Sequence, residues 1–147
     1  MVVRRERVVG AAPAEVWRIV SDPTRLAAWW PGVSRVEEAS REAWTTVLVS
    51  PTGKTVRADY SLVEAAEPER VLWRHEVEES PFERLLTEST TEIALAADEA
   101  GGTRVSVALD QHPRGWARFS PFQLRAAARK QAEAALEGLA ELLGDET

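Results

Sequence analysis

The sequence predicts an α+β domain in which seven antiparallel strands form a curved sheet, with two short helices and a long C-terminal helix. Two proline-led helix starts lie near the N-terminus, and the last quarter of the chain shows an uninterrupted helical pattern. Between them, short apolar segments are separated by short breaks rich in Pro, Gly and Ser. Breaks this short favour antiparallel pairing, because parallel strands need crossovers of about a dozen residues or more.

The N-terminal part predicts one strand followed by two short helices in tandem. The strand covers Val2–Val9. The first helix begins at Pro13, since proline suits the first helical position, and it ends near Val20. Asp22 is the expected N-cap of the second helix, which ends before Pro31 and Gly32.

The middle of the chain predicts six strands. The segment 55–65 alternates most clearly, with Val56, Ala58 and Tyr60 on one side, and this period of two is typical of a sheet with one covered face. A turn is expected at Pro51-Thr52-Gly53-Lys54. The expected strands are Val33–Ala39, Trp44–Ser50, Thr55–Ala65, Val71–Glu78, Leu85–Ala96 and Thr103–Asp110.

The C-terminal helix is expected to run from Ser120 to Leu143, before Gly144. Ser120 and Gln123 have the spacing of a capping box, in which the serine side chain caps the helix. About 22 residues span roughly 33 Å at 1.5 Å per residue, long enough to cross a whole sheet. One stripe of this helix is charged and is either a solvated face or a docking surface, for instance in a homodimer: Arg125, Arg129, Glu133, Glu137 and Glu141.

The opposite stripe of the same helix carries small residues, Ala127, Ala128, Ala132 and Ala135. A straight helix does not fill the concave side of a curved sheet, and alanines leave more space there. The stripe therefore indicates a cavity for an apolar ligand. Its alternative is that the alanines only favour helix and let it pack closely.

Composition excludes several classes of protein and site. The chain has 147 residues, 44% of them hydrophobic, with six tryptophans, two histidines, no cysteine and a net charge of -6. Without cysteine there is no disulfide, no thiolate zinc site and no cysteine nucleophile. The acidic balance argues against nucleic-acid binding. No signal peptide or membrane span is visible, so we expect a cytoplasmic protein without stable membrane insertion.

Five segments resemble a known superfamily, the one that groups START lipid-transfer domains, birch-pollen-type allergens and polyketide cyclases. The chain is most similar to its bacterial polyketide cyclase/dehydrase-like branch. The segments are Ala12-Pro13-Ala14-Glu15-Val16-Trp17, Ser21-Asp22-Pro23, Trp30-Pro31-Gly32-Val33, Glu67-Pro68-Glu69-Arg70-Val71-Leu72-Trp73 and Gly101-Gly102-Thr103-Arg104-Val105.

The resemblance implies a helix-grip fold in a single domain, residues 1–147, with a hydrophobic cavity under the last helix. It implies binding of a small hydrophobic or aromatic molecule, with polyketide cyclase- or aromatase-like activity as one outcome. An interaction module like the Hsp90 activators, and a lipid or quinone carrier, remain alternatives. Members with catalytic iron need a histidine and cysteine set that this chain lacks, so neither a metal nor another cofactor is expected. The protein is expected to be a monomer or a homodimer.

His75 is the one candidate for catalysis. It shares a strand face with Trp73 and Val77, and its imidazole could bond a ligand carbonyl or act as acid or base. The alternative is a histidine bonded to a neighbouring strand or facing solvent. Thr87 and Gln111 are further polar candidates, and Trp17 is expected to anchor the first helix. The expected ligand-binding residues are Trp30, Trp44, Tyr60, Leu62, Trp73, His75, Ser89, Thr91, Leu109, Trp116, Ala128 and Ala132.

Overall fold

The computed structural model describes residues 1–50 and 52–144, without the side chains of Trp116 and Ala117. The helical elements are α1 (Pro13–Val20), the 3₁₀ helices η1 (Pro23–Arg25) and η2 (Gly115–Phe119), α2 (Leu26–Trp29) and α3 (Pro121–Leu143). The strands are β1 (Val2–Val9), β2 (Val33–Glu37), β3 (Ala43–Val49), β4 (Thr55–Ala66), β5 (Arg70–His75), β6 (Leu86–Ala97) and β7 (Thr103–Pro113).

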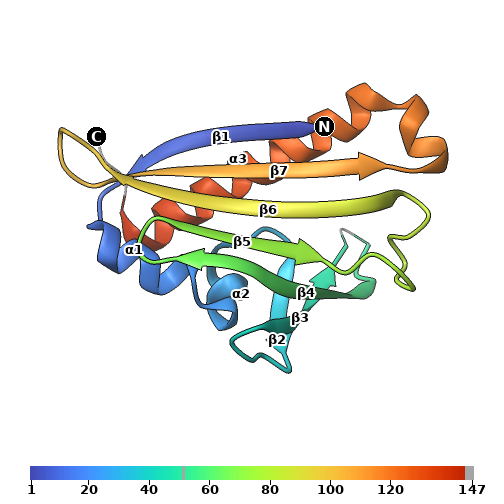
Figure 1. The fold of residues 1–147 in the computed structure, drawn as a ribbon, viewed down its shortest axis with the longest axis horizontal. Coiled ribbons are helices and arrows are strands. Elements are labelled where there is room, and N and C mark those ends of the chain that lie inside the picture. Colours follow the sequence, from blue (N-terminus) through green and yellow to red (C-terminus); the bar gives the residue numbers. More distant parts are fainter. Residues whose placement is uncertain (51, 145–147) are drawn as a thin grey trace.

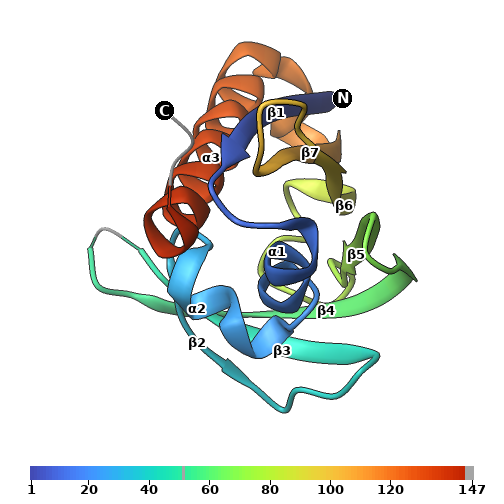
Figure 2. The same ribbon diagram turned by 90° about the vertical axis from the view of Figure 1, so that its left-hand side faces the viewer.

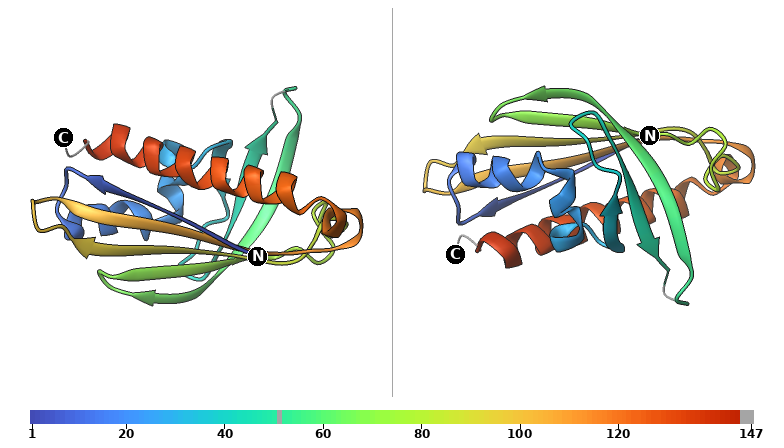
Figure 3. Two further views of the ribbon diagram at one scale, coloured as in Figure 1. Left: turned by 90° about the horizontal axis from the view of Figure 1, so that it is seen from above. Right: turned by 90° about the horizontal axis from the view of Figure 1, so that it is seen from below.

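The strands form one antiparallel sheet in the order β1-β7-β6-β5-β4-β3-β2. Figure 1 shows the strands side by side, and Figure 2 shows the sheet curling around the helices, with α3 closing the open side. The two views of Figure 3 show α3 running along the length of β1 and β7. The predicted fold class is confirmed.

Most strand boundaries differ from the prediction by one or two residues, and the ends of β5 and β7 differ by three because of local hydrogen bonding. β5 ends at His75, where its pairing with β6 ends, and residues 76–85 leave the sheet in turns. One of these turns is closed by Ser80, whose backbone N–H and hydroxyl both donate to the carbonyl of Val77. β7 continues to Pro113, because its last residue still pairs with Leu86.

The two predicted helix caps have different outcomes. The Asp22 carboxylate accepts from the backbone N–H of Thr24 at 3.0 Å, so this cap is confirmed. The prediction of a capping box at Ser120 is wrong, because its side chain makes no cap hydrogen bond. The first turn of α3 begins at Pro121 without that cap.

The predicted turn between β3 and β4 forms as well. Gly53 adopts a φ of 85°, a left-handed conformation that glycine reaches without strain. The Ser50 N–H donates to the carbonyl of Lys54 at 2.9 Å. Pro51, the first residue of the predicted turn, lies outside the described residues.

The C-terminal half of α3 packs tightly against the rest of the molecule. Trp17, on α1, is buried in the same core. At Gly138 the helix passes so close to α2 that an added Cβ would stand 2.3 Å from the carbonyl oxygen of Trp29. The charged stripe of α3 is exposed, and Glu133 accepts from Arg5 at 3.1 Å. The buried residues of α3 are Ala128, Ala132, Ala135, Leu136, Leu139 and Ala140.

Candidate functional site

A cavity of about 160 Å³ lies between the concave face of the sheet and α3. Six strands, β2 to β7, the loop after β5, the segment around α2, and α3 contribute to its wall. The lining residues are Leu26, Trp30, Val33, Trp44, Thr46, Leu48, Tyr60, Trp73, His75, Phe82, Leu86, Ser89, Thr91, Leu109, Gln111 and Gln131.

One line of directly paired residues crosses five strands of the sheet and forms much of this wall. Side chains of paired residues lie on the same face of an antiparallel sheet. We name these five residues the cross-strand row. In order from β3 to β7, the row consists of Trp44, Tyr60, His75, Ser89 and Gln111.

Seven rings form a continuous chain of contacts along the cavity. The His75 imidazole stacks on Tyr60 with a centroid distance of 4.8 Å, and Phe82 meets its other side edge-on at 4.7 Å. Trp44 stacks on Tyr60 at 6.0 Å and contacts Trp73 at 5.9 Å. The chain continues from Trp73 to Trp30 and Trp29. Aromatic pairs of this kind contribute about 0.5–1.5 kcal/mol each beyond burial, so the contacts stabilise this arrangement of rings.

Four polar side chains of the cavity wall lack protein partners. They are the hydroxyls of Ser89 and Thr91 and the amides of Gln111 and Gln131, and none bonds another described residue. Ser89 and Thr91 are only 7% and 6% exposed. All four line the cavity, and none has its polar atoms fully sealed from open space. Their polar atoms are therefore free to bond water or a ligand in the cavity.

The titratable groups in the wall are neutral near pH 7. Burial lowers the pKa of His75 below its ordinary value, although the charges of Asp59 and Glu76 act to raise it. Burial raises the pKa of Tyr60 to about 12, although a hydrogen bond with Thr46 opposes the shift. No Asp, Glu, Lys or Arg is among the described residues that line the cavity.

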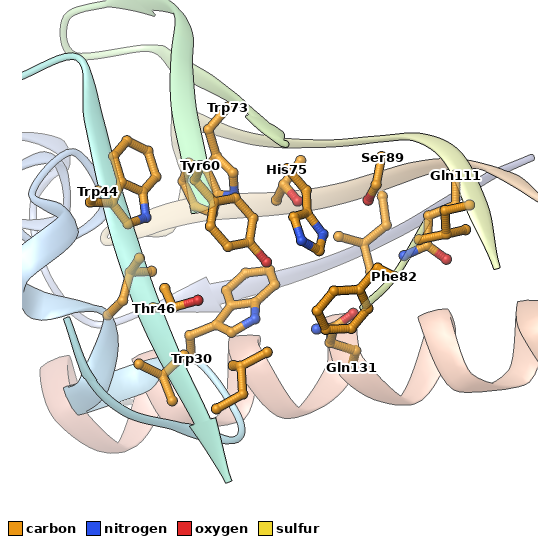
Figure 4. Close-up of a pocket in the computed structure, with 16 residues that line it drawn as sticks. Trp30, Trp44, Thr46, Tyr60, Trp73, His75, Phe82, Ser89, Gln111 and Gln131 are labelled. Atoms are coloured by element: carbon orange, nitrogen blue, oxygen red, sulfur yellow. The ribbon is translucent and has the colours of Figure 1, made fainter. Parts of the chain in front are cut away.

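Two nitrogen atoms of the cross-strand row are sealed inside the protein. Trp44 Nε1 and His75 Nε2 have no hydrogen-bond partner among the described residues and no contact with open space. They lie on opposite sides of the Tyr60 ring, which stacks on both (Figure 4). His75 therefore belongs to the wall, and its Nε2 is inaccessible unless its neighbours move.

The structure brings most of the expected ligand-binding residues together around the cavity. Gln111 also lines it. Whether any of these residues binds a ligand stays a prediction. The expected residues that line the cavity are Trp30, Trp44, Tyr60, Trp73, His75, Ser89, Thr91 and Leu109.

The placement predicted for other residues is wrong or falls outside the described part. Ala128 and Ala132 pack into the core and do not line the cavity, and Ala127 is exposed. Leu62 lines a separate pocket of only about 20 Å³, beyond Trp73. Thr87 is exposed and donates to the carbonyl of His112 at 3.2 Å. The side chain of Trp116 lies outside the described residues.

Sequence reasoning missed several lining residues. Thr46 and Leu48 follow Trp44 at the strand period of two, and Gln131 lies one helical turn after Ala128, so periodicity could have found them. Phe82 lies in the loop after β5, where no periodicity exists. The remaining missed residues are Leu26, Val33 and Leu86.

Metal-binding clusters and membrane-spanning helices are both absent from the described residues. No group of three or more His, Asp or Glu side chains there is placed to hold a metal ion. None of the helices in residues 1–50 and 52–144 is long and apolar enough to cross a membrane.

Comparison with known proteins gives one family and many similar folds. Residues 1–144 match the family described as polyketide cyclase / dehydrase and lipid transport. A search of curated proteins finds no match.

The similar structures include both one-domain and two-domain proteins. TTHA0849 from Thermus thermophilus superposes with a TM-score of 0.77 at 22% identity, covering 97% of each chain. CV1439 from Chromobacterium violaceum gives a TM-score of 0.76 at 21% identity, covering 99% of this chain and 98% of that one. The di-domain ARO/CYC BexL from the BE-7585A biosynthetic pathway gives 0.79 at 15% identity, covering 100% of this chain and 51% of that one. At these identities the likeness shows the fold alone.

Proposed function

The chain belongs to the polyketide cyclase / dehydrase and lipid transport family, and we propose that it binds a small hydrophobic or aromatic molecule in the cavity between the sheet and α3. One observation carries the proposal. The cavity has tryptophan rings toward one end and the unpartnered polar groups of Ser89, Gln111 and Gln131 toward the other (Figure 4). Ligand pockets combine mostly apolar walls with a few polar groups that fix orientation.

The wall also limits what chemistry the site could perform. His75 is the one titratable side chain of the described wall whose ordinary pKa lies near neutrality. A neutral imidazole could act as a general base in a cyclase-like step, if a ligand opened a path to it. Without such movement, the cavity would act by holding one conformation of the ligand.

The size of the cavity favours a small ligand over a long-chain lipid. A cavity of about 160 Å³ is close to an apolar cavity of roughly 150 Å³ that holds benzene in another protein. We therefore place binding of a small molecule before carriage of a lipid or quinone.

Native mass spectrometry of the purified protein, set beside a denatured control, tests the proposal. We expect a bound small molecule in the native spectrum only. The variant Ser89→Leu, which fills the cavity, should lose this molecule. The control Glu88→Leu should keep it, because neighbouring residues of a strand point to opposite faces and Glu88 is exposed.

The opposite result would point to another class of function. If wild-type protein carries no ligand and binds none from a panel of apolar compounds, the binding proposal fails. Capture of a chaperone by such ligand-free protein would then favour an interaction module.

A further inference from the structure

We infer that the ligand is an uncharged molecule with one aromatic ring and a polar head that both donates and accepts hydrogen bonds, such as a primary carboxamide. This inference rests on the proposed binding function and names the class of ligand.

The volume sets the number of rings. The cavity is not fully enclosed and offers about 160 Å³, and a cavity of roughly 150 Å³ in another protein accommodates one benzene ring. A second fused ring would have to displace the wall or protrude through the open side, where it would be less buried. Close-packed interiors resist such displacement, because side chains there already sit in their preferred rotamers.

The distribution of side chains sets the orientation of the ligand. Figure 4 shows Trp44 and Trp30 toward one end of the cavity and Ser89, Gln111 and Gln131 toward the other. The elements around these tryptophans also contribute aliphatic side chains to the wall, namely Leu26, Val33 and Leu48. The ring of the ligand therefore lies among the tryptophans, and its head lies at the polar end.

The polar groups set the chemistry of the head. A hydroxyl and a carboxamide each donate and accept, so Ser89, Gln111 and Gln131 can satisfy a head that does the same. A carboxylate head would find no cation in the described wall. Arg74, next to His75 in sequence, is exposed on the outer face of the sheet. An unpaired buried charge is strongly unfavourable, so the head is neutral.

A set of matched probes tests this class by calorimetry at pH 8. Phenylacetamide has the ring and the neutral head. Phenylacetate has the same shape with a charge, propylbenzene lacks the head, hexanamide lacks the ring, and 2-naphthylacetamide adds a second ring. We expect phenylacetamide to bind best. Phenylacetate should bind at least about tenfold more weakly, and the others about fivefold more weakly.

A pair of variants on α3 locates the head. Gln131→Leu should weaken the binding of phenylacetamide about fivefold and leave the affinity for propylbenzene unchanged. Only the amide head loses a hydrogen-bond partner in this variant. Gln123→Leu is the control, since Gln123 is an exposed glutamine of the same helix. It should change neither affinity.

Defined results overturn the inference. Phenylacetate binding as well as phenylacetamide would refute the neutral head, and tighter binding of 2-naphthylacetamide would refute the single ring. Equal effects of Gln131→Leu on phenylacetamide and propylbenzene would refute the position of the head. Binding of hexanamide alone would overturn the inference but leave the proposed function standing. Failure of every probe, with ligand-free protein in native mass spectrometry, would remove both.

Discussion

The same sheet and the same helix enclose two regions of opposite character. In the packed region, defined by Ile93, Thr103, Val105 and Leu139, every side chain is fully buried. In the cavity region, defined by the lining residues given above, the interior is partly empty, and polar side chains stand among the apolar ones. The buried residues of α3 begin at Ala128, whereas most residues of its first two turns are exposed.

The inward face of β6 shows how small the difference in sequence is. Ile93 and Leu95 face the packed region, and Ser89 and Thr91 face the cavity, at the same spacing along one strand. The Thr103 hydroxyl in the packed region donates to the carbonyl of Ala11 at 2.7 Å, whereas the Thr91 hydroxyl has no partner among the described residues. A binding site therefore arises where the core pattern continues but volume and hydrogen bonds are left unfilled.

The largest expected difference between the regions comes from removing a leucine in each. Leu139→Ala removes a fully buried side chain and should cost about 3–5 kcal/mol in free energy of unfolding. Leu86→Ala should cost nearer to about 2 kcal/mol, because one side of Leu86 already faces empty space. Urea unfolding measures both. Equal losses would mean that the cavity region is as well packed as the rest.

A smaller effect is expected where α3 meets α2. Gly138→Ala places a Cβ 2.3 Å from the Trp29 carbonyl oxygen, so the helices must separate, at a cost of about 2 kcal/mol. The control Glu137→Ala, at an exposed position of the same helix, should change stability by less than about 0.5 kcal/mol. An unchanged melting temperature in Gly138→Ala would show that this contact is loose.

One substitution made in both regions should have different consequences. Thr103→Val removes the hydroxyl and leaves the Ala11 carbonyl unpaired, which should cost about 1–2 kcal/mol. Thr91→Val removes a hydroxyl without a protein partner, so unfolding free energy should stay level or rise slightly. A loss of stability in Thr91→Val similar to that in Thr103→Val would show that the two regions do not differ in how their hydroxyls are bonded.

The smallest perturbation is a titration of the wild-type protein. Tyr60 is the only tyrosine in the chain, so absorbance at 295 nm reports its ionisation alone. Burial raises its pKa to about 12, because the phenolate loses hydration inside the protein. We expect no phenolate signal below about pH 11 while the protein stays folded. A midpoint near 10 would show that water fills the cavity region.

Periodicity predicted which faces of the strands are buried but not what lies against them. The alternation around Tyr60 and around Trp73 identified the inward faces, and both residues line the cavity. Leu62 shares the inward face of Tyr60 and still lies outside the cavity, in the smaller second pocket. A period of two distinguishes the two faces of a strand. The distance between the sheet and the helix decides whether an inward side chain lines the cavity or packs in the core.

Local patterns also failed where tertiary contacts decide the outcome. Ser120 has the residues of a capping box, yet its backbone angles do not place the hydroxyl at the helix end. The small side chains of Ala128 and Ala132 predicted space, but α3 approaches closely at those positions and fills it. Gly138, which marks the closest approach, has no distinguishing pattern in the sequence.

The cross-strand row makes the site depend on strand register, and this has an evolutionary consequence. A shift of one residue between β5 and β6 would bring Arg74 or Thr90 opposite the partners of the row and point the inward side chains of the shifted strand outward. Insertions within these strands should therefore abolish the site, whereas the β6–β7 turn around Gly101 can change length freely. Substitution at Ser89 or Gln111 leaves the register untouched. New ligand preferences can therefore arise one residue at a time on an unchanged scaffold.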